Sequence, residues 1–127
     1  MGHAEIQLGR YEQSIAHIKQ AFARSPRDPL RGAWHMDLGL AESCLGRLDV
    51  GIAELKRAID AAYRTFIVYA FLAGAEAAKG NDAEAKTALA EARRLNPQLT
   101  IKWFGENAGL PPAIIVEGWR KAGLPEE

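Results

Sequence analysis

Cysteine, net charge and long apolar runs are scarce in this sequence. Its one cysteine, Cys44, cannot form an internal disulfide, which suits a reducing cytosol. Sixteen basic and sixteen acidic side chains cancel, so overall charge gives no reason to expect nucleic acid or an anionic membrane as a partner. No apolar run approaches the roughly 18 residues of a membrane span, and the N-terminus has no signal-peptide apolar region. We therefore expect a cytoplasmic protein with neither a nucleic-acid nor a membrane partner.

Motifs for cofactors and catalysis are absent as well. There is no G-x-x-x-x-G-K phosphate loop and no G-x-G-x-x-G after a strand. His35, Gly39 and Glu42 share one helical stripe, so a small-ligand or metal-dependent enzyme site around His35 and Glu42 is an alternative hypothesis. That site lacks further ligands at suitable spacing, and no base–nucleophile pair is evident. We therefore expect no catalytic, metal or cofactor-binding residue.

The sequence does contain a phrase that recurs. Residues 45–59 read LGRLDVGIAELKRAI, residues 8–22 read LGRYEQSIAHIKQAF, and residues 79–92 hold a looser copy. Gly9, Gly46 and Gly80, spaced by about 35 residues, each predict a tight turn between two helices. A fixed period in this range indicates a stacked array of repeats.

Helical periodicity and turn residues predict an all-α chain. Apolar residues recur at helical spacing, and no apolar–polar alternation is long enough for a strand. The expected helices cover residues 11–24, 30–45, 49–62, 66–79, 82–95, 100–107 and 113–121, preceded by the last turn of a helix at residues 4–8. Asp49, Thr65 and Asp82 are the expected N-caps. We interpret the chain as truncated at its start, with Met1-Gly2-His3 as an expression scar or a fragment start.

The repeated phrase resembles the tetratricopeptide family. Small residues at the family's helix-crossing positions are Gly39, Gly51 and Ala58 in one repeat and Ala73, Ala85 and Ala92 in the next, which ends at Pro97. The resemblance implies an antiparallel helix-pair solenoid, a tetratricopeptide-like superhelix, over residues 1–97, with repeats at 4–26 (partial), 30–63 and 65–97. Residues 98–127 break the period and are expected to form a helical cap that covers the last apolar face. Glu42 and Glu76 depart from the family, which usually has an aromatic residue there.

The same resemblance implies a groove lined by the first helix of each repeat. Its candidate residues are mostly small or apolar: Ala33, Met36, Leu40, Ser43, Ile67, Ala70, Gly74 and Ala77. We therefore expect a non-catalytic scaffold that binds a protein or peptide partner, or another domain of its own chain, in a shallow groove. A neighbouring helix, such as the C-terminal cap, is the alternative occupant of this surface. A purely structural spacer or oligomerisation segment is the third hypothesis.

Two further expectations concern the ends of the chain. The stretch Arg120-Lys121-Ala122-Gly123-Leu124-Pro125-Glu126 is similar to the tetratricopeptide-containing tail of bacterial class III adenylate or guanylate cyclases. That likeness implies a C-terminal fragment of a larger signalling protein, without its catalytic parts. Truncation at the start would leave Ile15, Ile18 and Phe22 partly uncovered, so we expect a homodimer or crystal contact through this edge.

Overall fold

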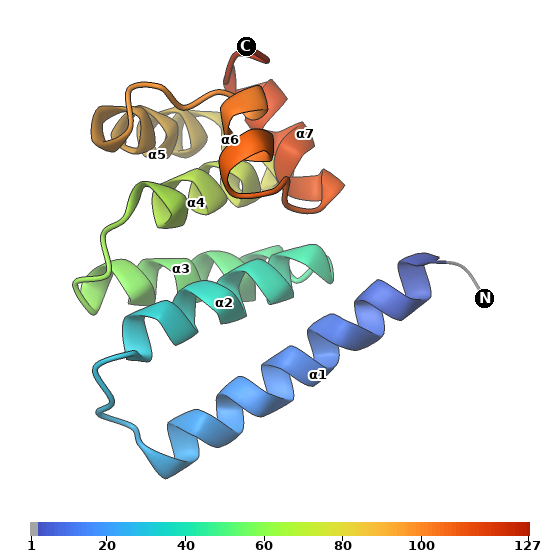
Figure 1. Cartoon of the computed structure of the whole chain (residues 1–127), viewed down its shortest axis with the longest axis vertical. Coiled ribbons are helices and arrows are strands. Elements are labelled where there is room, and N and C mark those ends of the chain that lie inside the picture. The colour runs from blue at the N-terminus through green and yellow to red at the C-terminus, as the bar shows by residue number, and fades with distance from the viewer. Residues whose placement is uncertain (1–2) are drawn as a thin grey trace. The chain divides into compact units, whose positions relative to one another are not determined.

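The computed structural model describes residues 3–127, with side chains from Arg10 onward. The described chain is helical and holds no strand (Figure 1), which confirms the all-α prediction. Its helices are, in order, α1 (His3–Arg24), α2 (Arg31–Cys44), α3 (Leu48–Asp60), α4 (Phe66–Lys79), α5 (Asp82–Leu95), α6 (Ile101–Asn107) and α7 (Ala113–Ala122). The chain divides into two compact units, the first ending at Tyr63 with α1 to α3 and the second beginning at Arg64 with α4 to α7. Met1 and Gly2 lie outside the described residues.

The pairs α2–α3 and α4–α5 are joined by the same kind of turn, as the repeated phrase predicts. Gly46 (φ 84°) and Gly80 (φ 93°) both adopt the left-handed backbone, which costs other residues roughly 1–2 kcal/mol. After Gly46, the backbone N–H of Arg47 donates to the carbonyl of Glu42 at 2.9 Å, and an equivalent 2.9 Å bond follows Gly80. This bonding pattern satisfies carbonyls at the helix end and reverses the chain.

The predicted turn at Gly9 is wrong. α1 continues through Gly9 as one helix, so the expected last turn at residues 4–8 and the expected helix at 11–24 form a single element. A glycine inside a helix costs only about 1 kcal/mol relative to alanine, and a continuous helix keeps its backbone hydrogen bonds at that point. The glycine therefore permits a turn without requiring one.

Of the three expected N-caps, the structure confirms one. Neither α3 nor α5 has a side-chain N-cap, so the expectation for Asp49 and Asp82 is wrong. Both lie inside the first turn of their helix, where a carboxylate still interacts favourably with the helix dipole. Thr65 is confirmed as the cap of α4, because its hydroxyl oxygen accepts from the backbone N–H of Val68 at 3.3 Å.

In the first unit, α2 lies between α1 and α3 (Figure 1). α2 and α3 cross closely at two glycines, since a Cβ on Gly39 would lie 2.5 Å from Leu55 Cγ and one on Gly51 would lie 2.8 Å from the Gly39 carbonyl oxygen. Only glycine lets the two backbones approach this far. On the other side of α2, Ile15 of α1 is buried against Leu38 and Ala41.

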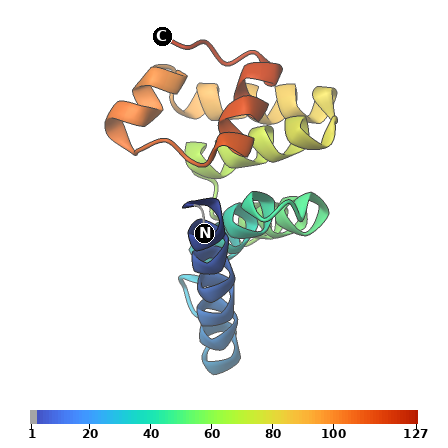
Figure 2. The same cartoon turned by 90° about the vertical axis from the view of Figure 1, so that its right-hand side faces the viewer.

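In the second unit, α4 packs against both α5 and α7, and Figure 2 shows α7 lying across this pair. α4 and α7 cross at Gly74 and Gly118, where a Cβ on Gly118 would overlap with the Gly74 carbonyl. Trp119 of α7 is fully buried, and its indole Nε1 donates to the carbonyl of Ala70 at 2.7 Å. α7 is therefore part of the core of this unit.

The C-terminal tail returns to α6. The backbone N–H groups of Ile101 and Lys102, which begin α6, donate to the carbonyls of Pro125 and Glu126 at 3.0 and 2.8 Å. These bonds satisfy two of the N–H groups that a helix start leaves without partners. Leu124 is buried beside them, so the last residues are packed into the second unit.

Candidate protein-interaction surfaces

The groove candidates on α2 divide into an accessible set and one buried residue. Ala33, Met36 and Leu40 are each half-buried. Ser43 is fully buried, and its hydroxyl donates to the carbonyl of Gly39 at 2.7 Å. Ser43 therefore belongs to the crossing with α3, and the accessible face of α2 is formed by Ala33, Met36 and Leu40.

The corresponding candidates on α4 are largely covered by the chain itself. Ala70, Gly74 and Ala77 are buried, and Ile67 is half-buried. α7 lies against Gly74, where Ile115 Cγ2 would be 2.8 Å from an added Cβ, and the Trp119 indole bonds to Ala70. The alternative occupant named above, a helix of the C-terminal segment, is what covers this part of α4.

A hollow of about 360 Å³ opens between α1 and α2 in the first unit. Its lining comes from both helices: Tyr11, Ser14, His17, Ile18, Asp37, Leu40 and Ala41. Leu40 thus lies both in the predicted groove and in this hollow. Asp37 keeps contact with solvent, but surrounding protein atoms partly desolvate its carboxyl group and raise the pKa above its ordinary value.

The second unit has a hollow of its own, of about 460 Å³, between α4 and α5. It is lined by Tyr69, Leu72, Ala83, Glu84, Thr87, Ala88 and Glu91. Glu91 forms an ion pair with Arg94, which donates to both of its carboxylate oxygens and lowers the pKa of the carboxyl group. The residues predicted for the groove do not line this hollow.

The α1 edge is mostly used inside the unit. Ile15 is buried in the cluster with α2, and Ile18 and Phe22 are partly buried against the same cluster. Phe22 also lies edge-to-face on Trp34, with ring centroids 5.2 Å apart. The expectation of a homodimer therefore depends on the exposed parts of Ile18 and Phe22 and stays a prediction.

His35 and Glu42 take part in separate contacts. His35 Nδ1 lies 2.6 Å from Glu54 Oε2 on α3, and the other oxygen of Glu54 accepts from Arg57 at 2.5 Å. Glu42 is 4% exposed, and its partner is Arg47. Among the described residues, no three His, Cys, Asp or Glu side chains gather as metal ligands.

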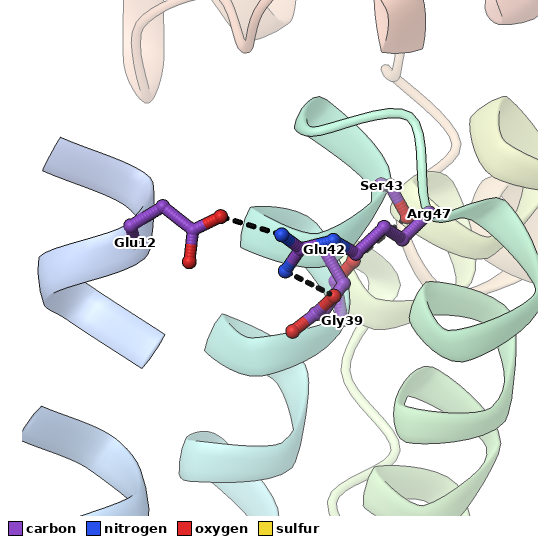
Figure 3. Close-up of polar contacts among 5 residues, drawn as sticks. All are labelled: Glu12, Gly39, Glu42, Ser43 and Arg47. Carbon is purple, nitrogen blue, oxygen red and sulfur yellow. Dashed lines mark hydrogen bonds and ion pairs between the residues drawn. The ribbon is translucent and has the colours of Figure 1, made fainter. Parts of the chain in front are cut away.

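Arg47 links α1 to the turn after α2 (Figure 3). Its Nη2 donates to Glu12 at 2.5 Å and its Nη1 to Glu42 at 3.3 Å. The hydrogen bond with Glu12, followed by that with Glu42, raises the pKa of Arg47 above its ordinary value. Sequence reasoning missed the contact with Glu12, because Glu12 and Arg47 become neighbours only when α1 has packed on α2.

Comparison with known proteins gives one match. Residues 1–28 match the family model described as Tetratricopeptide repeat. The matched segment covers α1 and part of the loop that follows, where the structure has a single helix; the helix pairs lie further along, in α2–α3 and α4–α5. No curated protein and no solved structure matches the chain.

The match supports the resemblance drawn from the repeated phrase. Tetratricopeptide repeats generally mediate protein–protein interactions and are generally non-catalytic, so the match suggests an interaction module. None of the described helices is both long and apolar enough to cross a membrane.

Proposed function

We propose that the chain is a cytoplasmic, non-catalytic scaffolding module that docks a protein partner on the α1–α2 side of its first unit. The observation that carries this proposal is the contrast between two equivalent faces. On α4 the face is covered by α7, whereas on α2 the residues Met36 and Leu40 stay half-buried, and Leu40 lines an open hollow. An accessible apolar surface next to a hollow is typical of a site where another protein binds.

The surface is shallow and mixed in character, which suits a peptide or helix better than a small substrate. The lining of the hollow combines the apolar Ile18, Leu40 and Ala41 with a few polar groups. Among the described residues, its polar side chains form no base–nucleophile pair, and His35 is engaged with Glu54. We therefore favour binding over catalysis.

A capture experiment with matched variants tests the proposal. The wild-type chain and the variants Leu40→Lys and Val50→Lys are each immobilised. Val50 is the control position, because it is a 48% exposed apolar residue of α3 outside the proposed surface. We expect a partner that wild type and Val50→Lys retain equally and that Leu40→Lys retains about tenfold less, because a charge is placed in the apolar contact. Circular dichroism melts check that both variants fold. Equal retention by all three chains would contradict this docking surface.

We further propose that the chain is the C-terminal part of a bacterial class III nucleotide cyclase. The support is the sequence likeness of residues 120–126. Measuring cyclic nucleotide formation by the intact parent, with and without this segment, tests the proposal. A parent that forms no cyclic nucleotide would exclude it.

A further inference from the structure

In α1, the face that α3 buries against α2 is only partly covered. The shared phrase aligns Ser14 and Ile18 of α1 with Gly51 and Leu55 of α3. In α3 both residues are buried, and both pack on Gly39 of α2. In α1, Ser14 is exposed and Ile18 is half-buried. The chain therefore shows one helix, α3, pairing with another helix on this face, with Gly51 at the position where α1 carries Ser14.

This partly covered face of α1 continues the packed interface between α1 and α2. Ile18 and Ala41 belong to the apolar cluster between the two helices and also line the hollow of about 360 Å³. Leu40 extends this apolar lining along α2. A helix placed here would contact α1 and α2 together and extend their existing core.

The charge of the hollow is one-sided. Among the side chains that the structure describes, its titratable lining groups are Tyr11, His17 and Asp37, and no lysine or arginine contributes to the lining. Within the part of the chain that the structure describes, Asp37 forms no ion pair and no hydrogen bond. Partial desolvation raises the pKa of this carboxyl group, so its negative charge is disfavoured in the chain alone. A cationic partner would relieve that penalty.

We propose that this hollow seats an amphipathic helix of a partner protein, which lays an apolar stripe against Ser14, Ile18 and Leu40 and pairs a lysine or arginine with Asp37. The inference rests on the proposed function and specifies its ligand. The internal pairing of α2 with α3 argues for a helix, and the charge of Asp37 argues for a basic side chain.

Three helical peptides test the proposal by titration into the ¹⁵N-labelled 127-residue chain. Each is an Ala/Leu-based helix of about 15 residues, long enough for partial helicity in water, and they differ only at one central position, which is Lys, norleucine or Glu. We expect the Lys peptide to shift the amide signals of Ser14, Ile18, Asp37 and Leu40. Its affinity should exceed that of the norleucine peptide by about fivefold, as a partly exposed ion pair allows, and the Glu peptide should bind weakest.

Two variants and a matched control separate the effect of charge on peptide binding from the effect of shape. Asp37→Asn should remove the preference for Lys and leave norleucine binding unchanged. Ser14→Leu should fill the hollow and weaken the binding of all three peptides. Gln13→Leu places the same side chain at the neighbouring exposed position and should leave their binding unchanged. Thermal melts show whether each variant remains folded.

The outcomes distinguish this inference from the proposed function. Equal binding of all three peptides to the hollow would overturn the basic partner while leaving the docking surface in place. Shifts confined to other helices would overturn the seat itself. If no peptide binds while Leu40→Lys still loses the captured partner, the helical ligand is wrong and the docking surface stands.

Discussion

Ala62 ends α3 in a left-handed conformation with φ 67°, which among the described residues is otherwise adopted by glycines alone. The bonds around it match those at Gly46, since the backbone N–H of Tyr63 donates to the carbonyl of Ala58 at 2.9 Å. A side chain in this conformation costs roughly 1–2 kcal/mol, while a new glycine loses about 0.4–1 kcal/mol through the greater freedom of the unfolded chain.

Ala62→Gly should therefore raise the free energy of unfolding by about 0.5–1 kcal/mol. The control is the reverse change, Gly46→Ala, where nothing crowds an added Cβ; it should lower the free energy by a similar amount. Urea denaturation measures both. A destabilised Ala62→Gly would show that the contacts of Ala62 stabilise the fold by more than its left-handed backbone costs.

Tyr11 and Cys44 give the stability a dependence on alkaline pH. Burial raises the pKa of Tyr11 to about 12, and the charge and hydrogen bond of Cys44 add to this effect. Burial also raises the pKa of Cys44, although its hydrogen bond with Tyr11 lowers it. Both groups release their protons at higher pH in the folded chain than in the unfolded chain, so the folded chain holds more protons and stability falls as pH rises.

We expect the Tyr11 contribution to be intact below the ordinary tyrosine pKa of 10.0 and to be lost as pH rises through about 12. The Cys44 contribution begins to fall earlier, as pH rises above the ordinary cysteine pKa of 9.0. Tyr11→Phe should therefore lose less stability than wild type across this range, because only Cys44 still contributes. Urea unfolding at a series of pH values from about 8 upward gives the free energy of unfolding of both proteins as a function of pH. Parallel curves for the two proteins would mean that Tyr11 is not protected from ionisation by the fold.

At the scale of the helix, α7 depends on a close approach to α4. Alanine at Gly118 would improve helix propensity by about 1 kcal/mol, but its Cβ would overlap with the carbonyl of Gly74. Because the obstacle is backbone, α7 has to move, and overpacking of this kind typically costs about 1–3 kcal/mol. Gly118→Ala should therefore lower the melting temperature.

The same substitution at Gly105 of α6 is the matched control. An added Cβ there would lie 3.3 Å from the Leu110 side chain, which is exposed and can shift. Gly105→Ala should therefore be neutral or stabilising by up to about 1 kcal/mol. If both variants melt alike, the close crossing of α4 and α7 does not contribute to stability.

The helices differ in how far the sequence could predict them. The predicted bounds 66–79 coincide with α4, because the Thr65 cap and the Gly80 turn are both local signals. The turn at Gly9 could not be decided in this way, since a glycine fits both a turn and a continuous helix. Which of the two forms depends on packing energy that a local phrase does not contain.

The candidate site was less predictable than the fold. The repeat register placed Met36 and Leu40 on the accessible face of α2, but Asp37 was not singled out, because its role depends on how α1 crosses α2. The contact between Glu12 and Arg47 likewise requires α1 to pack on α2, which brings Glu12 to the turn that carries Arg47. The period could not show that Gly74 lies beneath α7, since α7 falls outside the repeat.

At the scale of the whole molecule, we expect the balanced charge to favour self-association. The formal net charge is zero at neutral pH, and exposed apolar side chains such as Leu30 and Leu110 remain on the surface. Proteins near zero net charge repel one another least, so they associate most readily. Lys86 and Lys121 are exposed residues of the second unit, and replacing both by glutamate brings the net charge to about −4.

Lys86→Glu with Lys121→Glu should therefore raise the solubility, measured by precipitation with polyethylene glycol. Lys86→Arg with Lys121→Arg is the matched control, since it leaves the charge unchanged and should precipitate like wild type. Sedimentation of the same proteins tests the homodimer expected at Ile18 and Phe22, which belong to the first unit. A specific dimer should persist in both variants, because its apolar contact does not depend on net charge, whereas association that vanishes with added charge would exclude that dimer.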